Sequence, residues 1–202
     1  MSFLIGGENN SGSGTQQEII SGIVCAVCYM VVDCGTHLTE YKGETLKRRK
    51  VRLGFEIPSF RIEIEKDGKK VDMPRVLSEV WTASTGRKSN LRSVLQRWDG
   101  KELEGDYPEY DLKTLLGRQC QLQVVERKKK NGGMCSKIID ILPPTAGMEL
   151  ECENPHVYFS FDDDKPIPEI ITTGSLKWMM DRSLFPITEA FEYKNMNDDL
   201  PY

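Results

Sequence analysis

Basic side chains gather at three places in this chain of 202 residues. Cationic side chains bind phosphate groups, and on nucleic acids each such contact releases bound counterions. We therefore predict that these clusters contact a polyanion, although a lysine-rich hairpin tip can also serve solubility alone. The candidate phosphate contacts are Lys47, Arg48, Arg49, Lys50, Arg52, Arg87, Lys88, Lys128, Lys129 and Lys130.

Exposed aromatic rings would complete such a site, because the bases of a single strand stack on them. Trp81 lies in an extended stretch without clean alternation of apolar and polar residues, and it is the predicted stacking residue. Trp98 instead completes a helical stripe with Leu91, Val94 and Leu95, which predicts a place in the core.

Catalytic and metal-binding patterns are missing from the sequence. Cys25 and Cys28 form a C-x-x-C pair, but a zinc site needs further ligands at a suitable spacing. In a strand, residues three apart also point to opposite faces. The six cysteines are therefore interpreted as free thiols, and residues 162–164 as a solvated acidic loop. We predict no enzyme activity, no catalytic residue, no metal and no cofactor.

The net charge of −4 conceals an uneven distribution. Residues 1–40 carry −4, residues 41–137 carry +9 and residues 138–202 carry −9. A basic body with an acidic end is one of the asymmetries that indicate a polyanion-binding domain, although acidic ends also serve solubility. The charge pattern is thus compatible with a nucleic acid as the partner.

A membrane or secretion signal is not expected. The longest apolar run, residues 19–32, is interrupted by Ser21 and Gly22 and is too short to cross a membrane as a helix. Residues 1–22 contain no Lys or Arg, so the charged start of a signal peptide is missing. We therefore expect a cytoplasmic protein without a membrane partner.

Apolar and polar side chains alternate through residues 47–57, as in a half-buried strand. One face carries Val51, Leu53, Phe55 and Ile57, and the other carries Lys50, Arg52 and Glu56. The strand that holds the largest basic cluster therefore presents a partly basic outer face.

The order of the expected elements predicts the fold. We expect strands or hairpins at 20–33, 47–57, 60–73 and 75–85, a loop at 34–46, helices at 88–98 and 111–116, and strands at 118–128 and 134–142. This mainly β order, with a helical insertion between the third and fourth strands, fits an OB-fold-like barrel. An SH3-like barrel and an open α+β sandwich are the alternatives.

The chain divides into three parts by composition. Residues 1–18 are rich in Gly, Ser, Asn and Gln and are expected to form a flexible leader. Residues 19–144 form the expected OB-like nucleic-acid-binding domain, and residues 145–202 an acidic, partly helical C-terminal extension. Short helices are expected near 175–182 and 187–193.

The last five residues resemble the acidic tip of bacterial single-stranded DNA-binding proteins. The resemblance rests on Asp198, Asp199, Leu200, Pro201 and Tyr202, with Tyr202 where that family usually has Phe. In that family the carboxylates meet a basic rim and the terminal aromatic ring enters a pocket of a partner protein. The resemblance implies that this tip recruits replication or recombination proteins.

Residues 23–143 resemble a family of small bacteriophage proteins encoded in replication and recombination modules. The segments that carry this resemblance are 40–43, 88–92 with Trp98 and Gly100, 111–117 and 138–143. The cysteine-rich first strand and the 60–73 hairpin depart from that family. The resemblance implies a phage origin, an OB-like body and a place in the host-cell cytoplasm.

Together these observations predict a non-enzymatic phage protein that binds single-stranded DNA without sequence preference. The alternative is an OB-like protein-interaction module, such as a phage inhibitor or adaptor of a host factor, that binds no nucleic acid. A nuclease is a distant third reading. The oligomeric state is left open, a homo-oligomer included.

Overall fold

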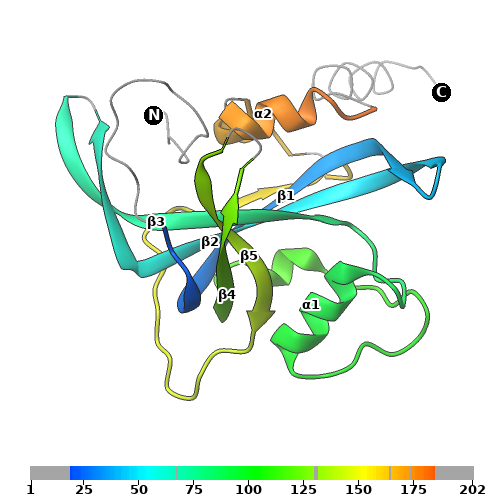
Figure 1. The fold of residues 1–202 in the computed structure, drawn as a ribbon, viewed down its shortest axis with the longest axis horizontal. Helices are drawn as coiled ribbons and strands as arrows, with labels where there is room; N and C mark the ends of the chain where they lie inside the picture. The colour runs from blue at the N-terminus through cyan, green and yellow to red at the C-terminus, as the bar shows by residue number, and fades with distance from the viewer. Residues whose placement is uncertain (1–18, 67, 130–131, 164, 173, 185–202) are drawn as a thin grey trace.

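Five antiparallel strands form a curled sheet in the order β3-β2-β1-β4-β5 (Figure 1). The computed structural model describes residues 19–66, 68–129, 132–163, 165–172 and 174–184. The strands are β1 (Gly22–Tyr41), β2 (Glu44–Lys66), β3 (Lys69–Thr82), β4 (Gln119–Lys128) and β5 (Met134–Leu142). A short strand, β6 (Val157–Phe159), runs parallel to β1. The mainly β fold class predicted from the sequence is confirmed.

Helices interrupt and follow this sheet. The helix α1 (Asn90–Asp99) and the 3-10 turn η1 (Leu112–Leu115) lie between β3 and β4, as predicted. Gly100 ends α1 with a φ of 67°, a left-handed conformation that glycine adopts readily. The C-terminal extension contains η2 (Glu169–Thr172) and α2 (Gly174–Met180), whereas the helix expected at 187–193 lies outside the described residues. No helix in the described ranges is long and apolar enough to span a membrane.

The loop predicted at residues 34–46 is wrong, because β1 continues to Tyr41 and β2 begins at Glu44. Residues 36–41 pair in antiparallel register with residues 44–49, so that only Lys42 and Gly43 form the turn. The register shifts between Asp33 and Thr36, where Gly35 has a φ of 73°. Gly35, which had indicated a loop, therefore lies at an irregularity within β1.

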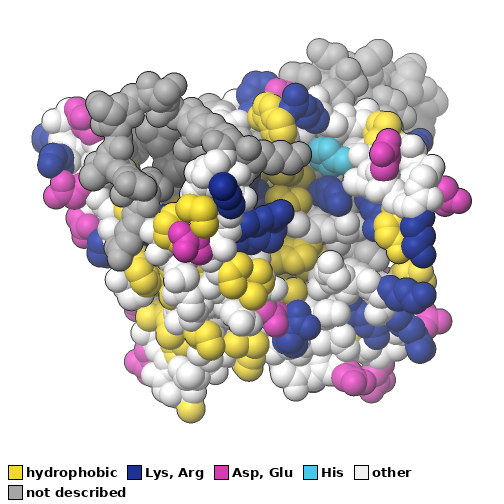
Figure 2. All heavy atoms as spheres, viewed as in Figure 1, with side chains coloured by type: hydrophobic (Ala, Val, Ile, Leu, Met, Phe, Trp, Pro, Cys, Tyr) yellow, Lys and Arg dark blue, Asp and Glu magenta, His cyan; other side chains and the backbone are white. Residues whose placement is uncertain are grey.

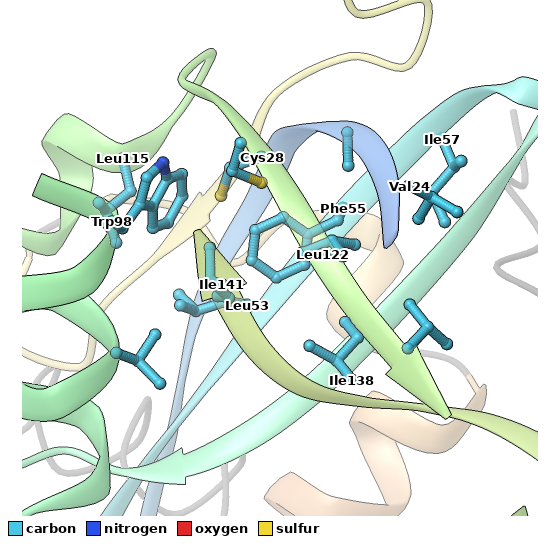
Figure 3. Packing of buried hydrophobic residues seen from close by; sticks show 14 of the residues in the cluster. Val24, Cys28, Leu53, Phe55, Ile57, Trp98, Leu115, Leu122, Ile138 and Ile141 are labelled. Carbon is cyan, nitrogen blue, oxygen red and sulfur yellow. The ribbon is translucent and has the colours of Figure 1, made fainter. Parts of the chain in front are cut away.

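The inner face of the sheet encloses the main core together with α1 (Figure 3). Trp98 packs against Phe55 with ring centroids 5.8 Å apart, and its indole N–H donates to the carbonyl oxygen of Gln119 at 2.9 Å. The predictions of Trp98 and of the apolar face of β2 as core are confirmed. The strands contribute Val24, Cys28, Leu53, Phe55, Ile57, Leu122, Ile138 and Ile141 to this core.

The outer face of β1 is buried as well, under the C-terminal extension. Tyr29, Met30, Val32 and Cys34 pack there with residues of β6, η2 and α2. Figure 1 shows α1 and α2 on opposite sides of the sheet. Both faces of β1 are therefore apolar, which explains its nearly continuous hydrophobic run.

Two residues of β2 shape this outer face: Gly54 makes room for β1, and Glu56 fastens the extension. A Cβ at Gly54 would lie 2.6 Å from Cε of Met30, so glycine leaves room for Met30. Glu56 is fully buried, and its carboxylate accepts from the backbone N–H groups of Glu153 (2.9 Å) and Asn154 (2.8 Å). The Asn154 amide also donates to Glu56, at 2.6 Å. The buried charge is thus satisfied by the loop that leads into β6.

Candidate nucleic-acid interface

Alternate residues of β2 place three cations on the outer face of the sheet. Arg48, Lys50 and Arg52 are two residues apart in an uninterrupted stretch of strand, so their side chains leave the same face. Lys50 pairs with Thr82 and Arg52 with Val80 on the neighbouring strand β3. Figure 2 shows many Lys and Arg side chains on the right half of the view, below α2 and along the β1–β2 hairpin.

The cations of this face contact neutral groups within the described part of the chain. The Lys50 ammonium donates to the Thr82 hydroxyl at 2.9 Å. The Arg52 guanidinium donates to the hydroxyls of Ser78 at 2.7 Å and Ser175 at 3.0 Å. Arg48 lies over the exposed Tyr41 ring, 5.4 Å from its centroid. Among the residues that the structure describes, no carboxylate forms an ion pair with these three charges.

Burial and the neighbouring Arg48 guanidinium lower the pKa of the Lys50 ammonium. Both causes disfavour the charged form of Lys50. An anion placed beside Lys50 would act in the opposite direction, because it would stabilise that charge. The site is therefore electrostatically suited to a phosphate group.

The other two members of the 47–52 cluster face the opposite side of β2. Arg49 donates to the carboxylates of Asp33 and Asp162, the latter at 2.7 Å, and the bond to Asp33 raises the pKa of its guanidinium. Lys47 is exposed and pairs with Leu38. The predicted five-residue cluster thus divides into an outward triplet, a structural Arg49 and a separate Lys47.

Trp81, the predicted stacking residue, lies away from the outward cations. It pairs with Val51, and the side chains of such a cross-strand pair lie on one face of the sheet. That face is the inner one, where Trp81 is half-buried and packs against the main core. The structure therefore separates Trp81 from the cations of the outer face.

The remaining predicted phosphate contacts lie in two loops. Arg87 forms an ion pair with Asp106, and the exposed Lys88 follows it just before α1. Lys128 is exposed at the end of β4, and the backbone N–H of Lys129 donates to the carbonyl oxygen of Gly133 at 2.7 Å. Lys130 lies outside the described residues. The docking tip, Asp198, Asp199, Leu200, Pro201 and Tyr202, also lies outside them.

Sequence reasoning missed the aromatic ring that does lie beside the outward cations. Trp178 of α2 is 61% exposed, and the Arg182 guanidinium lies 3.8 Å from its ring centroid. Trp178 and Lys50 line one shallow groove between α2 and the sheet. The heptapeptide of α2 offered one signal, since Leu176 and Met180 are four apart and Trp178 lies between them on the other side of the helix.

The cysteines hold no metal cluster in the described parts of the chain. All six are free thiols, and no group of three His, Cys, Asp or Glu side chains there could bind a metal ion. Burial raises the pKa of Cys28 to about 12, and burial with the Glu56 carboxylate does the same for Cys152. These thiols are therefore protonated at neutral pH and act as packing groups.

Comparison with known proteins adds no family to this picture: the chain matches no protein-family model, and a search of curated proteins found no match.

Proposed function

We propose that this chain is a bacteriophage protein that binds single-stranded DNA without sequence preference and acts in replication or recombination. The proposal includes an OB-fold body. Its support is the strand order β3-β2-β1-β4-β5, with α1 between β3 and β4. The Lys137 ammonium of β5 also lies 3.1 Å from the Glu79 carboxylate of β3, so the sheet curls toward closure. OB-folds bind oligonucleotides over strands 2 and 3 and the adjoining loops.

One observation carries the proposal: the outward cations of β2 lack carboxylate partners among the described residues, whereas several arginines elsewhere have them. Arg61, Arg97 and Arg118 form ion pairs with Asp72, Asp140 and Asp99, respectively. Within the described ranges, Arg48 contacts a ring, and Lys50 and Arg52 contact hydroxyls. A row of uncompensated cations on the face that OB-folds use is what a phosphate backbone requires.

Exposed aromatic rings favour single strands over duplexes. Tyr41 and Trp178 are 54% and 61% exposed, and each lies against an arginine of this surface. A base of a single strand can stack on such a ring, whereas the bases of a duplex already stack on one another. The pairing of cations with rings therefore suits an unpaired strand.

The experiment compares two double variants in oligothymidine titrations at several salt concentrations. Arg48→Gln with Lys50→Gln removes two phosphate contacts, so the slope of log affinity against log salt should fall by about 1 to 1.5. Lys69→Gln with Lys70→Gln removes the same charge at the start of β3, away from the groove, and should leave the slope unchanged. Equal slopes for both double variants would rule out phosphate binding by the outer face of β2.

The proposal also assigns partner recruitment to the acidic tip. We expect deletion of Asp198 to Tyr202 to abolish capture of replication or recombination proteins from infected-cell lysate. Single-strand affinity should be unchanged or slightly higher at low salt, because fewer carboxylates compete with phosphate. Identical partner sets for the full and shortened chains would instead favour the alternative, in which the folded body makes the protein contacts.

A further inference from the structure

A shallow groove of about 280 Å³ lies between α2 and the outer face of β2 and β3. It is smaller than the ~300–1,000 Å³ of sites that enclose drug-sized ligands, so its size suits one unit of a polymer. No carboxylate of the described residues lines it. The lining residues are His37, Lys50, Val80, Trp178, Met179 and Arg182.

We propose that this groove is a nucleotide subsite, in which Trp178 stacks on one base of the single strand and Lys50 contacts the adjoining phosphate. The inference rests on the proposed function and deepens it. It moves the stacking residue from the body of the sheet to the C-terminal extension. It also makes α2 part of the DNA-binding surface.

The two ends of the groove have complementary chemistry. Trp178 offers a flat ring that is 61% exposed, and the Arg182 guanidinium 3.8 Å from its centroid adds a cation. Lys50 is held in place by its hydrogen bond to Thr82, 2.9 Å long. A nucleotide carries both a flat aromatic base and an anion, and so it matches the ring and the cations together.

The extension holds this ring firmly over the sheet. Leu176 and Met180 of α2 are buried in the outer cluster, at 1% and 0% exposure. The Arg52 guanidinium donates to the Ser175 hydroxyl at 3.0 Å, and the backbone N–H of Leu184 donates to the carbonyl oxygen of Thr36 at 2.6 Å. These contacts fix α2 before any ligand arrives, which reduces the entropy lost on binding.

The contrast with Trp81, the stacking residue predicted from the sequence, supports the choice. Trp81 faces the core from the inner side of β3, whereas Val80, its neighbour, lines the groove from the outer side. A base that reached the cations of β2 would therefore meet Trp178 rather than Trp81.

The test measures the affinity of the full chain for oligothymidine and for an abasic strand of equal length and charge. Trp178→Ala should weaken oligothymidine binding about 5-fold to 150-fold, the range expected for one lost stacked base. It should leave binding of the abasic strand and the slope with salt unchanged. Tyr107→Ala removes a ring that is 78% exposed in the loop after α1 and is the matched control, with no expected effect.

The possible results separate this inference from the function on which it rests. If the wild-type chain binds no single strand at low salt, the proposed function fails and the subsite with it. If the wild-type chain binds but Trp178→Ala binds equally well, only the subsite is overturned. Equal weakening on both strands would make Trp178 a structural residue and would also overturn it.

Fluorescence gives an independent reading of the same groove. Oligothymidine should quench the tryptophan emission of the wild-type chain, and Trp178→Phe should remove most of that quenching while keeping part of the affinity. Quenching that persists in Trp178→Phe would overturn the assignment. The assignment would also be overturned if an acidic aromatic peptide quenched the tryptophan emission and oligothymidine did not. That result would identify a protein-docking site.

Discussion

The outer face of the sheet has a covered half, over β1 and residues 54–56 of β2, and an open half, over residues 48–52 of β2 and the facing part of β3. The covered half presents Tyr29, Met30, Val32 and Cys34, and the C-terminal extension buries all four. The open half presents Arg48, Lys50 and Arg52, and the described part of the extension meets it at the groove beside α2 and at the hydrogen bond from Arg52 to Ser175. The described part of the extension therefore packs mainly on apolar surface and borders the row of cations rather than covering it.

Gly54 marks the border between the two halves. On one side of it Met30 fills the space that a Cβ would need, and on the other side Arg52 begins the row of cations. Arg52 belongs to both halves, because its guanidinium hydrogen-bonds Ser175 of α2 and still contributes a charge to the open face.

The largest expected effect comes from opening the covered half. Met180 is fully buried there, so Met180→Ala should lower the free energy of unfolding by about 2–5 kcal/mol. Chemical denaturation measures this change. Lys177→Ala, on the exposed side of the same helix, should stay within about 0.5 kcal/mol of wild type. Equal losses of unfolding free energy in the two variants would mean that burial of the Met180 side chain does not stabilise the packing of α2.

High pH should weaken the covered half through its buried thiol. Burial raises the pKa of Cys34 from 9.0 to about 12, so the unfolded chain loses this proton first. The stabilising contribution is complete below pH 9 and is lost as pH rises toward 12, by about 1.4 kcal/mol per pH unit. Denaturation of Cys34→Ala between pH 8 and 10.5 should show a shallower decline than wild type. If the free energy of unfolding fell equally with pH in wild type and Cys34→Ala, Cys34 would not contribute to the pH dependence of stability.

The smallest expected effect concerns Arg49 of the 47–52 cluster, whose charge the carboxylates of Asp33 and Asp162 neutralise. The Asp162 side chain is 72% exposed, so Asp162→Asn should change stability by less than about 1 kcal/mol. The same variant should bind single-stranded DNA slightly more tightly at low salt, because one competing carboxylate is gone. A weaker interaction with DNA would show that Asp162 supports the site rather than opposing it.

Local patterns predicted those parts of the fold that depend on near neighbours. Alternation identified both faces of β2, and the stripe of Leu91, Val94, Leu95 and Trp98 identified α1 and its buried side. These features arise from side-chain periodicity and backbone preference within a few residues. They needed no knowledge of distant partners.

Features that depend on distant partners were not predictable from the sequence in this way. The parallel pairing of β6 with β1 joins residues more than one hundred positions apart, and β6 has only three residues. The inward direction of Trp81 follows from its pairing with Val51, and its own segment shows no clear alternation. Trp178 became a candidate only once α2 was placed over the sheet beside Lys50.

The central claim is that the body of this protein binds single-stranded DNA through the open half of its outer face. Fluorescence polarisation of labelled oligothymidine, measured against a duplex of equal length, tests it most directly. We predict that the full chain binds the single strand tighter than the duplex by about tenfold or more, with affinity falling steeply as salt rises. Equal affinity for the two forms, or no binding of either at low salt, would contradict the account.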